Sequence, residues 1–343
     1  MNLFVSVILP VKNEERFVEE SLSSLLAQDY DREGFEILVV DDHSTDRTRQ
    51  IVEIYLRKDP RIRLLTNVGT GTASARNVAL MHSNGDVIVN FSGHVRASKS
   101  FLRTVAFKLV NADQDVAAVG CKHETASDEP FFARVAGLAL STYMGGIGST
   151  YRQYASDRYV SSVAFASYRH EILNVVGGFD ESMRPMGDDL ELNLRLGELG
   201  YRLLYTPATV VYHRKDSSLV GFSRRMLLYG IARAMVTIRH PRQFNPVHAI
   251  PSTLLLILLA CIAVVVLFGT LPILLISLWS LYVLTCLVSA LFAGGRLGTR
   301  FTALLMAMYP IMHFTYGLGY IAALPRVLLG TARSTEKISK KRR

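Results

Sequence analysis

Short apolar runs alternate with amphipathic segments along the first 215 residues. Four runs rich in β-branched residues cover positions 5–9, 35–40, 62–65 and 87–91. Such runs are typical of strands that are buried on both faces. Between them, apolar residues recur at helical spacing, as at Val18, Leu22 and Leu25. The alternation predicts an α/β fold with a mostly parallel sheet covered by helices on both faces.

Polar clusters follow three of these predicted strands. The clusters are Asn13 with Glu14, Asp41 with Asp42, and Ser92 with His94. In open parallel sheets the ligand site lies at the carboxyl ends of the strands. The sequence therefore predicts a ligand site built from these loops.

The middle of the chain, residues 101–172, is less regular. We expect a strand at 116–121, a surface loop at 123–130 and a further strand at 161–167. Residues 138–151 have no clear period. They could line an acceptor cleft or form an ordinary loop.

An acidic turn opens the stretch from Gly177 to His213. Asp188, Asp189 and Glu191 lie at the start of a predicted amphipathic helix. Carboxylates at a helix N-terminus are stabilised by the helix dipole, so a capping role is sufficient to explain them. Three acids within four residues after a glycine-led turn are also typical of a positioned general base. Taken alone, this stretch is compatible with both the capping role and the general base.

Three long uncharged or nearly uncharged segments follow in the last third of the chain. They cover residues 249–268, 271–293 and 301–324. Each is long enough to cross a hydrocarbon core of about 30 Å. We expect a transmembrane region at 249–325 with two crossings. Pro310, Gly317 and Gly319 interrupt the third segment, so it is either a third crossing or a broken, re-entrant hairpin, the latter being favoured.

The charge distribution bears on that choice. Net charge is +9, and basic residues cluster in a tail at 326–343 and in segment 216–245. A simple third crossing would put the tail outside, against the positive-inside rule, whereas a re-entrant hairpin returns it to the cytoplasm. Segment 216–245 predicts a basic amphipathic helix, either interfacial or packed on the protein core. Its Arg233 is a candidate contact for a phosphate group.

Composition narrows the class of protein further. Half of the residues are hydrophobic, and the basic residues border the apolar segments without aromatic interleaving. This placement fits an anionic membrane surface better than nucleic acid, which we do not expect as a partner. The three cysteines lack metal-ligand spacing and favour a reducing compartment. The N-terminus is typical of a buried strand and not of a signal peptide, so the first domain, residues 1–215, is expected in the cytoplasm.

Five motifs occur in an order that is characteristic of one family. They are residues 5–15 (VSVILPVKNEE), 39–48 (VVDDHSTDRT), 75–77 (ARN), 85–88 (GDVI) and 177–189, which begins GGFD and ends GDD. Over residues 4–240 the chain resembles an inverting family-two glycosyltransferase of the GT-A fold. The similarity is greatest to the membrane-bound exopolysaccharide, or succinoglycan-type, subgroup.

The resemblance implies roles for individual residues. Asp189 matches the general base that deprotonates the acceptor hydroxyl, and Asp188 occupies the position of a glutamate that orients acceptor or base. The implied donor-binding residues are Pro10, Asn13, Glu14, Asp41, Asp42, Arg76 and Ser92, with Arg233 as a further phosphate contact. The donor is expected to be a nucleotide sugar, UDP-linked by preference.

The metal motif departs from the family pattern. Ser92-Gly93-His94 stands where the family carries Asp-X-Asp. His94 and, with lower rank, His213 are the candidate metal ligands, and imidazole favours Mn²⁺ over Mg²⁺. The alternatives are that arginine or lysine replaces the metal, that the transferase is weak or inactive, or that His94 only caps the turn.

The resulting hypothesis is a multi-pass inner-membrane enzyme with a cytoplasmic catalytic domain. It moves a sugar from a nucleotide donor to a lipid-linked or polysaccharide acceptor. One rival is a polyprenyl-phosphate hexosyltransferase, in which the acceptor is the phosphate and Asp189 need not act as a base. A second rival is a GT-A protein that assists polysaccharide assembly without catalysis.

Overall fold

The chain divides into two compact units. The computed structural model describes residues 3–146, 154–184, 186–215, 217–270 and 272–341, the last sixteen of these as backbone only. The first unit comprises residues 1–126 and 151–214, and the second comprises 127–150 and 215–343. Each unit is described by itself.

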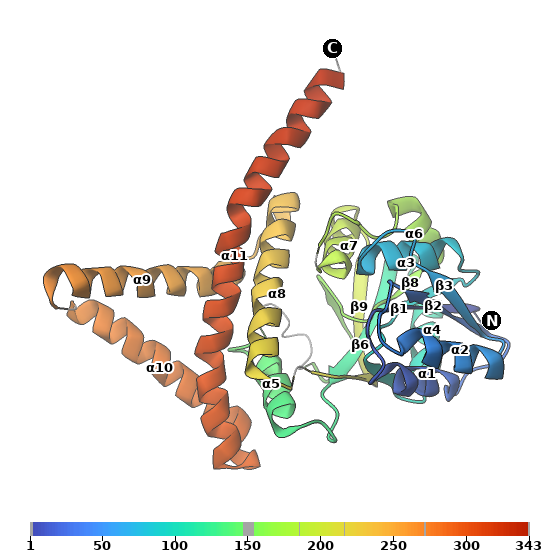
Figure 1. The fold of residues 1–343 in the computed structure, drawn as a ribbon, viewed down its shortest axis with the longest axis horizontal. Coiled ribbons are helices and arrows are strands. Elements are labelled where there is room, and N and C mark those ends of the chain that lie inside the picture. Colours follow the sequence, from blue (N-terminus) through green and yellow to red (C-terminus); the bar gives the residue numbers. More distant parts are fainter. Residues whose placement is uncertain (1–2, 147–153, 185, 216, 271, 342–343) are drawn as a thin grey trace. The chain divides into compact units, whose positions relative to one another are not determined.

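A mixed sheet organises the first unit (Figure 1). Its order is β3-β2-β1-β4-β8-β6-β9-β5, and β7 also pairs with β9. The pairs among β1 to β4 are parallel, as predicted, whereas β8 runs antiparallel to β4 and β6. The strands are β1 (Val5–Val11), β2 (Phe35–Asp41), β3 (Ile62–Thr66), β4 (Val87–Asn90), β5 (Val95–Ala97), β6 (Val116–Glu124), β7 (Arg158–Val160), β8 (Ser167–Arg169) and β9 (Arg202–His213).

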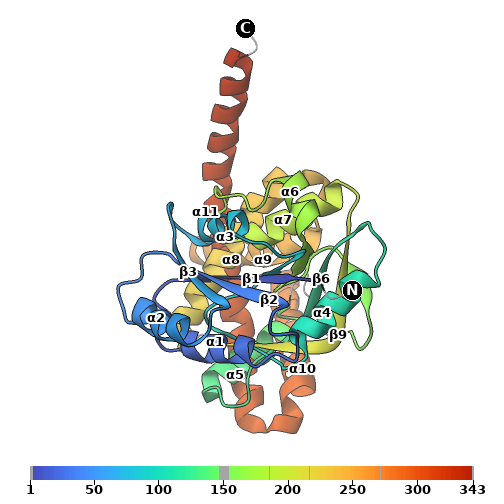
Figure 2. The same ribbon diagram turned by 90° about the vertical axis from the view of Figure 1, so that its right-hand side faces the viewer.

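Helices cover both faces of this sheet (Figure 2). Helices α1 (Val18–Leu26), α2 (Thr48–Lys58) and α4 (Phe101–Val110) pack on one face. Helices α3 (Thr72–Met81), α6 (His170–Val176) and α7 (Asp188–Glu198) pack on the other. Because side chains alternate along a strand, β1 contributes Val7 and Leu9 to the first core and Ile8 to the second. The predicted α/β class is confirmed.

One predicted strand was placed wrongly. Residues 161–166 form no strand, and only Ser167 of the predicted segment lies in β8. The side-chain amide of Asn193 donates a hydrogen bond of 2.7 Å to the Val163 carbonyl. A side chain thirty residues away therefore satisfies this backbone group in place of a neighbouring strand.

The second unit is helical. Its helices are α5 (Phe131–Ser141), α8 (Leu219–Arg239), α9 (Ile250–Phe268), α10 (Ile273–Gly294) and α11 (Thr299–Lys341), with short 3₁₀ turns η2 (Pro241–Gln243), η3 (Pro246–Ala249) and η4 (Gly295–Leu297). Three helical stretches, Pro246–Phe268, Ile273–Leu297 and Thr299–Pro325, are long and apolar enough to cross a membrane. Helix α5 takes up part of the stretch at 138–151, and residues 147–151 of that stretch lie outside the described residues.

The broken hairpin expected in the third apolar segment is not observed. Helix α11 is continuous through Pro310, Gly317 and Gly319. The two glycines instead admit neighbouring backbone, because a Cβ on Gly317 would lie 2.6 Å from the carbonyl oxygen of Pro251, and one on Gly319 would clash with that of Leu227. They are packing glycines and do not break the helix.

Candidate active site

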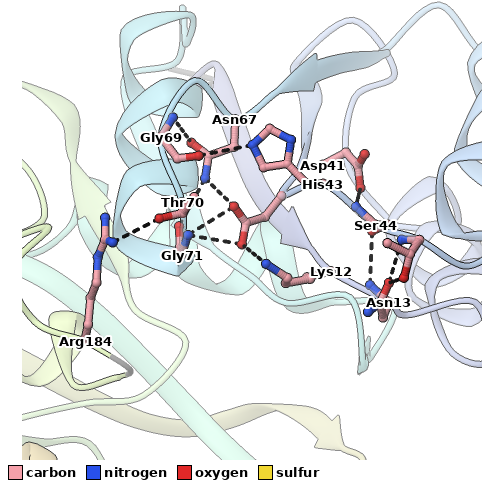
Figure 3. Close-up of polar contacts among 12 residues, drawn as sticks. Lys12, Asn13, Asp41, His43, Ser44, Asn67, Gly69, Thr70, Gly71 and Arg184 are labelled. Carbon is pink, nitrogen blue, oxygen red and sulfur yellow. Dashed lines mark hydrogen bonds and ion pairs between the residues drawn. The ribbon is translucent and has the colours of Figure 1, made fainter.

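Three loops meet at the carboxyl ends of β1, β2 and β3 (Figure 3). The side-chain oxygen of Asn13 accepts a hydrogen bond of 2.8 Å from the backbone N–H of Thr45, while the Asn13 N–H donates to Ser44 Oγ at 3.0 Å. Asn13 has a φ of 55°, a left-handed conformation that asparagine adopts more readily than most residues. Asp41 accepts a bond of 3.2 Å from the Ser44 N–H. Hydrogen bonds thus connect the loop that carries Asn13 with the loop that carries Asp41, two of the three clusters predicted at this edge of the sheet.

Asp42 connects its own loop with the loops after β1 and β3. Its buried carboxylate accepts hydrogen bonds from the Asn67 amide at 2.7 Å, the Gly71 N–H at 3.0 Å and Lys12 Nζ at 3.1 Å. Burial raises the pKa of Asp42, but the bonds from Asn67, Lys12 and Gly71 outweigh it and hold the pKa below its ordinary value. Asn67 and Gly71 did not figure among the expected site residues. The glycine-rich composition of residues 67–73 was the available signal.

Glu14, His94 and His213 form a second cluster. Glu14 Oε1 and His94 Nδ1 lie 2.6 Å apart, and the rings of His94 and His213 have centroids 5.0 Å apart. The antiparallel register of β5 and β9 pairs Val95 with His213 and so brings the two histidines together. The Ser92 carbonyl accepts a hydrogen bond from the N–H of Val95, which forms the turn that carries His94. Among the described residues, no group of three His, Cys, Asp or Glu side chains has metal-binding geometry.

The acidic turn at the start of α7 is held by α3. Arg76 Nη1 donates to Asp188 Oδ2 at 2.5 Å, and both side chains are buried. The Arg76 guanidinium also lies over the ring of Phe179, 5.3 Å from its centroid. The structure therefore gives Arg76 a carboxylate partner within the protein, next to the predicted base.

Asp189 lies beside this pair and is half-buried. Burial raises its pKa, the positive charge of Arg76 lowers it and the negative charge of Asp188 raises it again, so that the net pKa is above the ordinary aspartate value. A carboxylate with a raised pKa is a better proton acceptor than an ordinary one. The site thus contains a group suited to general-base catalysis.

Asn77 anchors the turn that carries these acids. Its side-chain amide donates to the Phe179 carbonyl at 2.9 Å, and its oxygen accepts the Phe179 N–H at 2.9 Å. Arg195 adds a second anchor, since its guanidinium donates to the carbonyls of Val176 and Gly178 and pairs with Glu191. Neither anchor was among the residues expected from the sequence, although Asn77 belongs to the motif at 75–77.

The remaining expected residues lie as follows. Pro10 is near the end of β1, where its strand pairs with β2. Arg233 lies on α8 in the second unit, where its charge acts on His248 and Tyr316. The structure does not place it relative to the residues of the first unit.

The fold and these motifs identify the family. The chain matches Glycosyl transferase family 2 over residues 6–177 and Glycosyl transferase family group 2 over residues 96–315. It belongs to glycosyl transferase family 2 and is a glycosyltransferase enzyme, as the resemblance implied. The GT-A fold is confirmed by the mannosyltransferase PcManGT from Pyrobaculum calidifontis, solved with GDP-Man and Mn²⁺, with a TM-score of 0.66 and 21% identity over 94% of this chain and 88% of that one.

Several relatives match most of the chain, and two of them bear on the acceptor. One is the dolichyl N-acetyl-alpha-D-glucosaminyl phosphate 3-beta-D-2,3-diacetamido-2,3-dideoxy-beta-D-glucuronosyltransferase of Methanococcus voltae, 28% identical over 76% of this chain and 81% of that protein. The other is the succinoglycan biosynthesis protein ExoA of Rhizobium meliloti (strain 1021), 26% identical over 71% of this chain and 75% of that protein. Both likenesses agree with a family-two glycosyltransferase, and the second is to a succinoglycan biosynthesis protein.

Proposed function

We propose that this chain transfers a sugar from a nucleotide-sugar donor to a hydroxyl group of a lipid-linked or polysaccharide acceptor, with inversion at the anomeric carbon. The observation that carries the proposal is Asp189, with its raised pKa, held beside the buried Arg76–Asp188 pair. The names of the relatives support the acceptor class, since one acts on a dolichyl-linked sugar and the other serves succinoglycan biosynthesis.

The donor's nucleoside binds at the loops after β1 and β2. Asp41 and Glu14 supply carboxylate oxygens that accept hydrogen bonds from a base or from ribose hydroxyls. The carboxylate of Asp42 already accepts bonds from Lys12, Asn67 and Gly71, so its role is to order these loops. A UDP-linked donor remains our expectation. Arg233 on α8 contributes a cation for a phosphate group.

Asp189 acts as the general base. It takes the proton from the acceptor hydroxyl as the new bond forms between that oxygen and the anomeric carbon. The bond to the nucleoside diphosphate breaks on the opposite face, and the leaving group departs with its electron pair. Arg76 contributes by fixing Asp188 and by favouring the ionised form of the adjacent Asp189, because its charge opposes the two effects that raise the pKa of Asp189.

His94 and His213 are the residues that would hold a divalent ion. With its proton on Nδ1 facing Glu14, His94 keeps the Nε2 lone pair for a metal, an arrangement in which a carboxylate orients a ligating histidine. His213 offers a second imidazole close by. Two nitrogen ligands suit Mn²⁺ better than Mg²⁺. When bound, such an ion offsets the charge of the leaving diphosphate.

The acceptor explains why the chain carries a membrane unit. A lipid-linked sugar or a growing lipid-anchored glycan is confined to the bilayer, so an enzyme held at the membrane meets its acceptor there. We place the catalytic unit on the cytoplasmic side of the cell membrane, where nucleotide sugars are available.

A panel of radiolabelled nucleotide sugars, incubated with purified enzyme and lipid extracts from native membranes, tests the proposal. We expect one donor to label an organic-soluble or polymeric product through a mild-acid-stable glycosidic bond. A mild-acid-labile sugar phosphate would instead identify a polyprenyl-phosphate acceptor. Failure of every donor to bind in calorimetry with Mn²⁺ would refute a nucleotide-sugar enzyme.

A further inference from the structure

The first turn of α9 and the last turn of α10 meet α11 at two well-separated points. The first turn of α9 lies against Gly317, where the Ser252 hydroxyl donates to the Gly317 carbonyl at 3.4 Å. The last turn of α10 lies against Thr302, since a Cβ on Gly294 would be 3.1 Å from the Thr302 Cα. Fifteen residues separate these points on α11, which corresponds to about 22 Å of helix.

The other ends of α9 and α10 converge. Helix α9 ends at Phe268 and α10 begins at Ile273, so the two are joined by a short turn. The start of α9 and the end of α10 are thus about 22 Å apart, while their other ends meet at a tip. The two helices form a V, and α11 runs across its open end (Figure 1). Helix α10 is inclined toward α11, because contacts between the two continue from its last turn to Trp279, whose ring centroid lies 6.1 Å from that of Phe314, and include a hydrogen bond of 2.9 Å between Tyr282 and His313. Helix α11 thus runs across the axis of the V.

The tip of the V carries a dense group of exposed apolar side chains. Residues 249–295 contain no charged side chain, and the large apolar side chains beside the tip are between 73% and 82% exposed. They are Val266, Leu267, Phe268, Ile273 and Leu274. By contrast, Leu318 is the one exposed large apolar side chain among the described residues 299–325 of α11. The V therefore exposes more large apolar side chains than α11 does, as expected of a membrane-inserted element.

Helix α8 constrains α11 further. The two helices pack side by side with backbone contact, because a Cβ on Gly230 would clash with the Tyr316 carbonyl and one on Gly319 with that of Leu227. Helix α8 carries Arg224, Arg225, Arg233 and Arg239. If α11 crossed the hydrocarbon core, it would take these arginines in with it, at a high cost in free energy. At the membrane surface the same arginines can reach lipid headgroups.

We propose that α9 and α10 form the membrane-inserted element, with the tip deepest, and that α8 and residues 299–325 of α11 lie along the membrane surface. The exposed sides of the V then contact lipid acyl chains. The arrangement keeps the basic end of the chain on the side of the membrane where α8 lies. It removes the conflict with the positive-inside rule without a break in α11.

Depth measurements in lipid nanodiscs distinguish a surface helix from a crossing one. In a variant lacking the three native cysteines, spin labels are placed singly at Ala307→Cys and Leu318→Cys, two exposed positions on α11 that are eleven residues apart. A surface helix holds both labels at the same depth, whereas a helix along the membrane normal separates them by about 16 Å. Labels at Leu256→Cys and Leu267→Cys on α9, also eleven residues apart and exposed, are the matched control.

We expect equal depths for the α11 pair and clearly different depths for the α9 pair, with Leu267→Cys the deeper. Unequal depths on α11, as large as those on α9, would overturn the proposal. Absence of lipid contact at both α9 positions would also overturn it and would indicate that a second copy of the chain covers the V.

Reporter fusions test the same arrangement in the unmutated chain. A reporter that is active on only one side of the membrane is fused in turn to the N-terminus and to the C-terminus. The proposal gives both ends on the same side, because the V enters and returns. Three crossings would put them on opposite sides.

Discussion

Arg76 on α3 and Asp188 at the first position of α7 form a buried ion pair, with Nη1 and Oδ2 2.5 Å apart, although the two residues are 112 positions apart in the sequence. The pair fixes the start of α7 against α3. Its two charges act in opposite directions on the neighbouring Asp189. The motif at residues 75–77 and the acidic turn at the start of α7 are therefore coupled through their charges, although they are far apart in the sequence.

Opposite shifts in the pH dependence of activity follow from this arrangement. As a base, Asp189 must be ionised, so activity falls as the pH drops through its raised pKa. Asp188→Asn removes a charge that raises this pKa, and the acidic limb of kcat/KM should move to lower pH. Arg76→Gln removes the charge that lowers it, and the limb should move to higher pH.

The measurement is a pH–rate profile of each variant, with the remote surface change Asp31→Asn as the control. Shifts of both variants in the same direction, or none in either, would show that the pair does not act on the base.

Loss of the Asn77 anchor should impair catalysis more than donor binding. Asn77→Ala leaves the N–H and carbonyl of Phe179 without their partner and loosens the turn that leads to Asp189. A misplacement of about 1 Å can cost about 100-fold in rate, so we expect kcat to fall by about 10- to 100-fold with a smaller change in the donor KM. Asn111→Ala, which removes only a local bond to Phe107, is the matched control. A fall in kcat that is the same in both variants would contradict the anchoring role.

Metal dependence should involve His94. Treatment with EDTA should abolish transfer, and Mn²⁺ should restore it better than Mg²⁺. His94→Ala should raise the Mn²⁺ concentration needed for half-maximal activity, whereas His82→Ala should not, because His82 bonds to a carbonyl of its own helix. Transfer that persists in EDTA would mean that arginine or lysine, and not a metal ion, offsets the charge of the leaving diphosphate.

The Asp42 carboxylate should stabilise the loops after β1 and β3 in a pH-dependent way, because it accepts hydrogen bonds from Lys12, Asn67 and Gly71. Its pKa is lowered in the folded protein, so its contribution is present above the ordinary aspartate pKa and is lost as the pH falls through the lowered value. Asp42→Asn should reduce the free energy of unfolding by about 1–3 kcal/mol at neutral pH and raise the donor KM. In chemical denaturation, the difference from the parent protein should shrink at low pH. A difference that is constant with pH would mean that the charge is not involved.

Local patterns in the sequence predicted a good part of this molecule. The β-branched runs marked β1 to β4, and the uncharged segments marked α9 and α10, because both signals depend on neighbouring residues alone. The partners of Arg76 and Asn77 lie more than 100 residues away, so no local pattern could reveal the anchored turn. The segment at 161–166 resembled a strand, but Asn193 supplies the bond at Val163 that a neighbouring strand would otherwise supply.

Glycine was the least informative residue. Gly317 and Gly319 were interpreted as breaks in the third apolar segment, whereas in the fold they admit the backbones of α9 and α8. A glycine that ends a helix and one that permits close packing look alike in a single sequence. The choice between them depends on which neighbour is present, and this is settled only by the tertiary structure.

Comparison of Asp189→Asn with the parent enzyme tests the central claim most directly. Once the donor and acceptor are known, single-turnover transfer and donor binding are measured on both proteins at neutral pH. We predict that transfer falls by about 100- to 10,000-fold while the dissociation constant of the donor stays within a few-fold of the parent value. Transfer at the parental rate in Asp189→Asn would contradict the assignment of Asp189 as the general base.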